Sequence, residues 1–298
     1  MVRRNNDDSV EFEFLEECQL IHYKKNLEED EATFNDMLVY PFMKATTQVV
    51  ARGVEGCNAE FDVGERFLKA MGKQIKYIGI NTQSKSQYKA DGIVSLYGVD
   101  NMEVLLLETS GHFKNDDQTK ISFDHHKALY GTLAMLKCVS DTYKFGSMKT
   151  FQKIKIFFLQ AANNELLLWS LRFEPDGPLC ELWLERSLTI DHQFDKKVEF
   201  LPSMISFFWS VSEFLKETVI NIQNLKDEHY SQLKSLRFVT NTRLNLLTTA
   251  SMLPATSDHL GSHPRKPIYG IYEHCWKGSS QLKMSLKPKK LTMFQLNI

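Results

Sequence analysis

The sequence has few cysteines, and they form no recognisable framework. Five are present among 298 residues, an odd number, and they lack the CxxC pairs and the cysteine–histidine spacing of zinc sites. Scattered cysteines are typical of reduced thiols rather than of the disulfides of secreted proteins. We therefore expect an intracellular protein, nuclear or cytoplasmic.

Long hydrophobic runs and charge of a single sign are also missing. No stretch approaches the roughly 18 uncharged apolar residues of a membrane span, and residues 1–8 lack the apolar run of a signal peptide. The formal net charge is −1, so no overall basic field indicates a nucleic-acid-binding protein. The charge is uneven, however, because acidic residues gather near the start and basic residues near the end. We expect no membrane association.

The chain divides by pattern into four parts, without internal repeats. We expect an acidic flexible arm over residues 1–28, an α/β domain over 29–225, a C-terminal helix over 226–247 and a basic, disordered tail over 248–298. Within the domain the order is helix, three strands, helix, three strands, helix. This mixed order, with an antiparallel hairpin at its centre, predicts a three-layer α/β/α fold with a mixed sheet.

Hydrophobic periodicity and turn residues place the individual elements. In chain order we predict a helix over 30–51 kinked at Pro41, a short helix or loop over 59–72, a short strand over 76–80, a helix over 124–144, a hairpin over 153–173, a strand over 179–190 and a long apolar helix over 204–221.

One stretch, residues 89–111, carries most of the information about function. Two runs rich in Val, Ile and Leu flank the turn residues 98–101, which is the pattern of a β-hairpin. Symmetric pairing about this turn predicts four opposed pairs: Tyr97 with Met102, Ser95 with Val104, Ile93 with Leu106, and Asp91 with Glu108. The last pair places two carboxylates on one face of the sheet.

Asp91 and Glu108 are the candidate metal ligands. Like charges opposite each other on neighbouring strands are destabilising. A divalent cation bound between the two carboxylates would explain why they face each other. Mg²⁺ (or Mn²⁺) prefers oxygen ligands and recruits phosphate oxygens, and a bound metal activates water for attack on a phosphodiester. Lys89, one same-face step from Asp91, is placed to orient that water. The alternative is that the two carboxylates lie at the strand ends in solvent and are hydrated separately. A shift of one residue in the strand register would move Glu108 to the other face of the sheet.

The order of these elements resembles the PD-(D/E)XK nuclease superfamily, which has the restriction-endonuclease-like fold. In the motif of that superfamily an Asp precedes Glu-x-Lys on the next strand. Asp91 and Glu108 match the two acids, and Ser110 stands where the lysine is expected. The resemblance covers the predicted α/β domain.

The resemblance implies a replacement for the missing lysine, or a weakened site. Lys89 is the first candidate for that role and Lys120 the second. The resemblance also implies a further acidic metal ligand from the first helix, which Glu31 matches, with Asp30 and Asp36 as alternatives.

Exonuclease-like members of the superfamily carry Gln-x-x-x-Tyr on the helix that follows the Glu strand. His126 to Tyr130 has this spacing with His in place of Gln, so only Tyr130 carries over. Tyr130 is a candidate substrate contact, as is Ser110. The alternative is that Tyr130 is a residue of the hydrophobic core. The chain is also similar to divergent nuclease-like families of fungi linked to mobile elements.

The resemblance implies a Mg²⁺-dependent nuclease whose partner is nucleic acid, in the first instance DNA. Two other functions stay open. One is a catalytically inactive nuclease-like module that binds nucleic acid or protein, and the other is an unrelated α/β interaction domain.

Overall fold

The computed structural model describes residues 27–77, 88–174, 179–191 and 197–238. Most of the predicted acidic arm and all of the predicted basic tail lie outside these residues, as does the predicted strand 76–80 beyond Tyr77. Among the described helices, none is long and apolar enough to cross a membrane.

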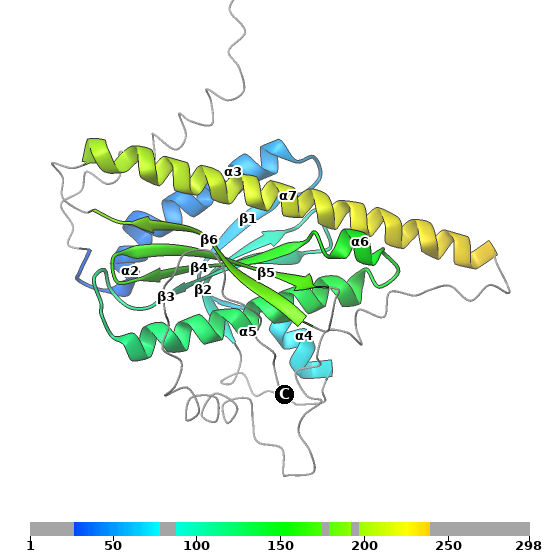
Figure 1. Cartoon of the computed structure of the whole chain (residues 1–298), viewed down its shortest axis with the longest axis horizontal. Helices are drawn as coiled ribbons and strands as arrows, with labels where there is room; N and C mark the ends of the chain where they lie inside the picture. The colour runs from blue at the N-terminus through cyan, green and yellow to red at the C-terminus, as the bar shows by residue number, and fades with distance from the viewer. Residues whose placement is uncertain (1–26, 78–87, 175–178, 192–196, 239–298) are drawn as a thin grey trace, which may run out of the picture.

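A mixed sheet of six strands forms the centre of the domain, in the order β1-β2-β3-β4-β5-β6 (Figure 1). The strands are β1 (Ala59–Phe67), β2 (Lys89–Leu96), β3 (Met102–Thr109), β4 (Lys155–Ala162), β5 (Glu165–Glu174) and β6 (Leu179–Thr189). β3 and β4 run parallel, whereas the other neighbouring pairs are antiparallel. Parallel neighbours need a crossover connection, and a helix supplies it here. The predicted α/β fold with a mixed sheet is confirmed.

Helices cover both faces of this sheet (Figure 1). On one face lie α3 (Tyr40–Gly53) and α7 (Lys197–Phe238), and on the other α5 (Gln118–Thr142) and α4 (Lys69–Tyr77). The rings of Phe42 and Phe208 stack between α3 and α7, with centroids 5.0 Å apart. The described residues therefore form three layers. From β2 onward their order of β2, β3, α5, β4 is the predicted one, whereas β1 and α4 lie where a helix or loop and then a strand were predicted.

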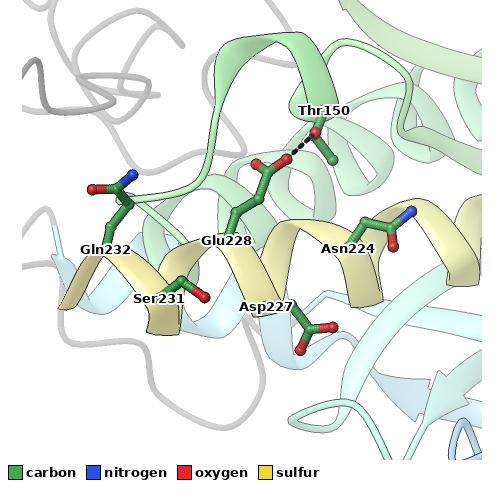
Figure 2. Close-up of a pocket in the computed structure, with 6 residues that line it drawn as sticks. All are labelled: Thr150, Asn224, Asp227, Glu228, Ser231 and Gln232. Carbon is green, nitrogen blue, oxygen red and sulfur yellow. Dashed lines mark hydrogen bonds between the residues drawn. The ribbon is translucent and has the colours of Figure 1, made fainter. Parts of the chain in front are cut away.

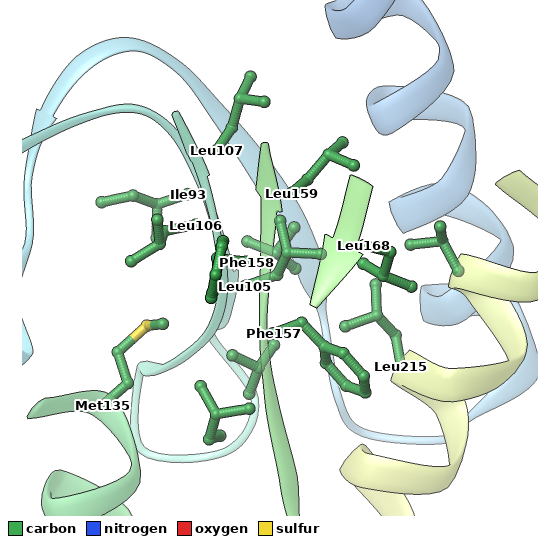
Figure 3. Packing of buried hydrophobic residues seen from close by; sticks show 14 of the residues in the cluster. Ile93, Leu105, Leu106, Leu107, Met135, Phe157, Phe158, Leu159, Leu168 and Leu215 are labelled. Carbon is green, nitrogen blue, oxygen red and sulfur yellow. The ribbon is translucent and has the colours of Figure 1, made fainter. Parts of the chain in front are cut away.

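The two central strands are covered on both faces. Residues 105–107 of β3 and 157–159 of β4 have no exposed surface. Figure 3 shows their side chains between Met135 of α5 and Leu215 of α7. A strand buried on both faces is a continuous apolar run rather than an alternating one, which explains the Val and Leu residues of β3. The polar residues at the end of β3 are therefore exceptional and need partners.

The first predicted helix is interrupted just before its proline. It consists of α2 (Glu31–Phe34), a π-helical turn η2 (Asn35–Val39) and α3. Pro41 lacks an N–H and its ring would clash with the carbonyl four residues earlier, so a widened turn relieves the conflict. Asp30 caps α2, since its Oδ1 accepts the backbone N–H of Thr33 at 2.6 Å.

The predictions between residues 59 and 80 are wrong where the structure describes them. The predicted helix or loop over 59–72 begins as strand β1, and the start of the predicted strand 76–80 belongs to helix α4. Polar and apolar residues do not alternate regularly along β1, because the strand is irregular. Gly64 has a φ of 80°, and the register with β2 shifts between Val63 and Arg66.

The other predicted elements lie close to their observed bounds. The second hairpin is β4 and β5, which turn at Asn163 (φ 56°), and β6 follows it. α5 begins at Gln118, six positions before the predicted start at Asp124. The helices predicted over 204–221 and 226–247 are one helix as far as the structure describes them. α7 continues through the expected boundary because Ile222 and Leu225 are still buried against the core.

Candidate functional site

β2 and β3 form the predicted hairpin and end beside each other at the carboxylates. Ile93 pairs with Leu106 as predicted. The ladder ends with Gly92 opposite Leu107, and Asp91 and Glu108 are the next residues on the two strands. The two candidate ligands therefore lie just beyond the paired ends of β2 and β3.

Toward the turn, the predicted register is wrong. A bulge between Val94 and Ser95 shifts the ladder, and beyond it the observed pairs are Ser95 with Glu103 and Leu96 with Met102. The turn consequently spans residues 97–101 instead of 98–101, with Asp100 and Asn101 at φ values of 51° and 53°. With one more residue in the turn, the pairs next to it differ in register by one residue from the pairs at Ile93 and Val94, and the bulge takes up this difference.

The carboxylate of Asp91 reaches across to β3. Its Oδ2 accepts the backbone N–H of Thr109 at 2.7 Å, while Oδ1 accepts no hydrogen bond within the described residues. Burial raises the pKa of Asp91 to about 6; the Thr109 N–H opposes this rise, and Glu31 and Asp124 add to it. The hydroxyl of Tyr40 donates to the backbone carbonyl of Asp91 at 2.9 Å, which fixes this end of β2 against α3.

Glu108 is buried, with 2% of its side chain exposed. Its Oε2 accepts a hydrogen bond from Nζ of Lys127 at 2.6 Å, and its Oε1 accepts one from the hydroxyl of Tyr88 at 3.0 Å. Burial raises the pKa of Glu108 to about 8; Lys127 opposes this rise and Asp91 adds to it.

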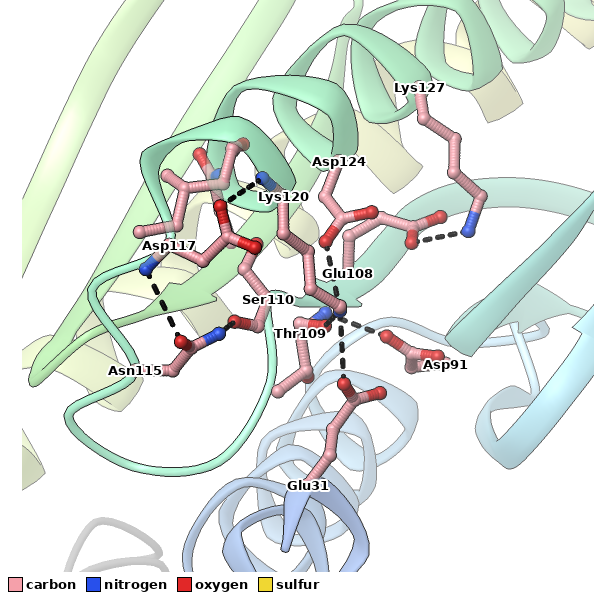
Figure 4. A network of polar contacts seen from close by, with 12 residues as sticks. Glu31, Asp91, Glu108, Thr109, Ser110, Asn115, Asp117, Lys120, Asp124 and Lys127 are labelled. Carbon is pink, nitrogen blue, oxygen red and sulfur yellow. Dashed lines mark hydrogen bonds and ion pairs between the residues drawn. The ribbon is translucent and has the colours of Figure 1, made fainter. Parts of the chain in front are cut away.

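Helix α5 brings a third and a fourth carboxylate into contact. Asp117 caps α5 by accepting the backbone N–H groups of Thr119 and Lys120, so Lys120 lies in the first turn. Nζ of Lys120 contacts Oε2 of Glu31 at 3.1 Å and Oδ2 of Asp124 at 3.2 Å (Figure 4). The carboxylate cluster therefore consists of four acids from four elements: Glu31 (α2), Asp91 (β2), Glu108 (β3) and Asp124 (α5).

Lys89, the first candidate for the catalytic lysine, is placed differently. Its Nζ forms an ion pair with Oε2 of Glu65 on β1 at 2.6 Å and lies over the ring of Phe67. Among the described residues, no hydrogen bond or ion pair joins Lys89 to the carboxylate cluster. The ammonium groups that do contact the cluster belong to Lys120, the second candidate, and to Lys127, which the sequence analysis did not single out.

The two predicted substrate contacts, Ser110 and Tyr130, are buried and partly buried. Ser110 is buried, and its Oγ has no hydrogen-bond partner among the described residues. Its backbone is fixed by hydrogen bonds to Ala161 at 2.8 Å and Asn115 at 2.6 Å. Tyr130 is partly buried and packs against the hydrophobic core, the position that the alternative interpretation gave it.

Sequence reasoning missed Asp124 and Lys127, although a signal for them exists. Lys120, Asp124 and Lys127 are spaced by four and three residues, which places them on one face of a helix. A helix predicted to begin after the N-cap Asp117, rather than at Asp124, would have included Lys120 and shown that the three residues share one face.

The donors of the carboxylate cluster suit a magnesium ion in kind, because carboxylate oxygens are the ligands that Mg²⁺ prefers. As the side chains stand, no group of three or more His, Cys, Asp or Glu residues in the described ranges is arranged to hold a metal. Two ammonium groups, those of Lys120 and Lys127, contact three of the four carboxylates. Metal binding would require at least one of them to move.

A second polar site, a hollow beside α7, has a structural explanation. It is lined by residues of α7 and by Thr150 of the short helix α6 (Met148–Phe151), as Figure 2 shows. Glu228 accepts hydrogen bonds there from the Thr150 hydroxyl at 2.6 Å and the Ser147 backbone N–H at 2.7 Å. These contacts attach α6 to α7, and none of the four cluster acids lines the hollow.

Comparison with known proteins found no matching protein-family model, no matching curated protein and no matching solved structure.

Proposed function

We propose that the chain is a divergent Mg²⁺-dependent nuclease with a restriction-endonuclease-like core, acting on nucleic acid and in the first instance on DNA. The observation that carries this proposal is the imbalance of charge in the carboxylate cluster. Four acids converge near the ends of β2 and β3, where two ammonium groups contact three of them, Glu31, Asp124 and Glu108. Burial is the main cause of the raised pKa values of Asp91 and Glu108, and neighbouring carboxylates add to the rise while Lys127 opposes it.

The roles of the acids follow from their positions. Asp91 and Glu108 would hold the cation, with Glu31 and Asp124 as further ligands. When bound, Mg²⁺ supplies a Lewis acid that lowers the pKa of its water and neutralises charge developing on the phosphodiester. The Thr109 N–H holds Oδ2 of Asp91 and leaves Oδ1 available as a ligand.

The motif lysine, replaced by Ser110, is in our proposal supplied by helix α5. The ammonium of Lys127 forms an ion pair with Glu108, whereas that of Lys89 forms an ion pair with Glu65. Lys127 can therefore orient an attacking water at the cluster and offset the charge of a phosphate. Tyr88 donates to the other oxygen of Glu108 and fixes the carboxylate that both groups share.

Cleavage of plasmid and single-stranded DNA in Mg²⁺ or Mn²⁺ tests this proposal. Asp91→Asn, Glu108→Gln and Lys127→Met should each abolish cleavage, and Lys89→Met should leave it largely intact. Glu185→Gln is the matched control, because Glu185 is also paired with a lysine (Lys155, 2.7 Å) and a hydroxyl (Ser170, 2.7 Å), but on β6. Metal-independent cleavage, or cleavage that survives Asp91→Asn, would refute the assignment.

One observation favours a second function, a catalytically inactive nuclease-like module that binds nucleic acid or protein. Both oxygens of Glu108 are already engaged by Lys127 and Tyr88, and Ser110 lacks the ammonium of the motif. For this module we expect DNA binding without cleavage in either metal, and binding that Asp91→Asn does not change.

A further inference from the structure

The ammonium group of Lys120 has more partners than the single ion pair usual for a surface lysine. Its Nζ has three oxygens within hydrogen-bond distance: Oε2 of Glu31 at 3.1 Å, the backbone carbonyl of Thr109 at 3.1 Å and Oδ2 of Asp124 at 3.2 Å. An ammonium group has three donors, so all of them are used. The three oxygens come from α2, the end of β3 and α5, which meet at this point (Figure 4).

These three oxygens form a set of ligands that suits a cation by its chemistry. Two are carboxylate oxygens and one is a carbonyl oxygen, the hard ligands that Mg²⁺ and Mn²⁺ take in proteins. Their distances of 3.1–3.2 Å match an ammonium group, whereas Mg²⁺ would draw its ligands in to about 2.0–2.1 Å. Burial lowers the pKa of Lys120, but Asp124 and Glu31 outweigh this effect and raise it, so the group is a permanent cation.

We propose that Lys120 is a built-in counter-ion, which occupies the cation position of the carboxylate cluster in the metal-free protein and leaves it when a divalent cation binds. This inference rests on the proposed function, because it assumes that the cluster takes a metal. It deepens that function by assigning a regulatory role to Lys120: the apo cluster is kept folded by an internal cation, and metal must compete with that cation to enter.

The placement of the two cluster lysines explains why Lys120 is the one that leaves. Its side chain is 40% exposed, so the ammonium can turn out to solvent without crossing the core. Lys127 is 23% exposed and pairs with Glu108, whose burial makes the loss of its partner costly. Lys120 is thus exchangeable, while Lys127 stays.

Chemical labelling of lysines in the wild-type full chain tests the exchange directly. Amine acylation, read by mass spectrometry, should modify Lys120 slowly without metal and at least threefold faster in saturating Mn²⁺. Lys114 is the matched control, because its side chain is 45% exposed and its Nζ pairs with Glu28 at 2.6 Å. The rate at Lys114 should not change. An unchanged rate at Lys120 in protein that has bound Mn²⁺ would overturn the inference.

Mn²⁺ affinity, measured by calorimetry or electron paramagnetic resonance, provides the second test. Lys120→Met removes the competitor and should tighten Mn²⁺ binding at least tenfold, about 1.4 kcal/mol, whereas Lys114→Met should not. If Mn²⁺ binds equally well to wild type and Lys120→Met, the counter-ion role fails and the proposed function stands. If Mn²⁺ binds neither, the proposed function fails and takes this inference with it.

Discussion

The ammonium of Lys127 lies 2.6 Å from Oε2 of Glu108, although one residue is on helix α5 and the other on strand β3. Glu108 has almost no exposed surface, so this contact provides the counter-charge for an acid that water does not reach. The pair ties the helix to the sheet at the point where the carboxylate cluster is built. Its strength therefore bears on stability as well as on any chemistry of the cluster.

Removing Lys127 should destabilise the protein in a way that depends on Glu108. We expect Lys127→Met to lower the free energy of unfolding by about 1–3 kcal/mol at pH 8, since Glu108 loses the partner that stabilises its charged form and must take up a proton or stay an unpaired buried carboxylate. Urea denaturation without metal measures this value. The loss should be smaller at pH 5, where protonation removes the unpaired charge.

The double variant Lys127→Met/Glu108→Gln identifies the cause. If the penalty comes from the unpaired carboxylate, the double variant should be more stable than Lys127→Met alone, and a double-mutant cycle should give a coupling energy of about 0.5–3 kcal/mol. Strictly additive effects would show that Lys127 acts through its packing alone.

The stability of the metal-free protein should fall as pH rises through the range set by Asp91 and Glu108. Their pKa values in the folded protein, about 6 and about 8, lie above the ordinary values of 3.8 and 4.5. Between about pH 4 and pH 8 the folded state therefore holds more protons at these groups than the unfolded state, and their contribution is lost as pH increases. Thermal unfolding in EDTA at several pH values measures it.

Glu108→Gln isolates this contribution from other groups that titrate nearby. His125 and His229 have lowered pKa values, caused chiefly by burial, and they make stability rise with pH in the same range. The difference between wild type and Glu108→Gln cancels them. We expect the variant to gain in relative stability as pH rises, by several degrees in Tm at pH 8. A difference that is constant with pH would mean that Glu108 titrates normally.

The central hairpin was predictable because its pattern is local. The apolar runs and the turn fixed the pairing of Ile93 with Leu106, and with it the approach of Asp91 to Glu108. The register failed only toward the turn, where a bulge after Val94 depends on left-handed conformations at Asp100 and Asn101. Residue identities permit those conformations without requiring them.

The partners of the carboxylates were harder to predict because they depend on how α5 packs on the sheet. Sequence spacing places Lys89 one same-face step from Asp91, but the ion pair with Glu65 draws it toward β1. Lys127 reaches Glu108 because the helix passes close over β3 at Gly131. Only the packed structure sets that distance.

Helix α4 illustrates a second limit of sequence reasoning, and it yields a prediction. Its first turn has no acidic residue; instead the buried Glu103 on β3 accepts the backbone N–H groups of Lys69 at 2.9 Å and Ala70 at 2.7 Å. Glu103→Gln should cost about 1 kcal/mol, because an amide has one acceptor where the carboxylate has two and lacks the charge that favours a helix N-terminus.

Hydrogen exchange locates this loss. Amides of α4 should exchange faster in Glu103→Gln, with little change in β5. Glu60→Gln on β1 is the control, because Glu60 is exposed and its replacement should stay within about 0.5 kcal/mol. Uniform acceleration over the whole sheet would instead assign Glu103 to global stability.

Two helical glycines should respond to alanine in opposite directions. At Gly72 in α4 nothing lies within 4 Å of the added Cβ, so Gly72→Ala should stabilise the protein by up to about 1 kcal/mol through helix propensity. At Gly131 in α5 the Cβ would lie 2.6 Å from Leu106 Cδ2 and 2.8 Å from the Tyr88 hydroxyl. Gly131→Ala should therefore destabilise by about 1–3 kcal/mol, since the helix must move away from the sheet.

The second effect should reach the carboxylate cluster. The Tyr88 hydroxyl donates to Glu108, so displacing it weakens one of the two contacts that hold this carboxylate. We expect the pKa of Glu108, followed by carboxyl ¹³C chemical shifts, to change in Gly131→Ala and to stay constant in Gly72→Ala. If Gly131→Ala stabilised the protein as Gly72→Ala does, α5 would not need its close approach to β3, and the contact of Tyr88 with Glu108 would not depend on that glycine.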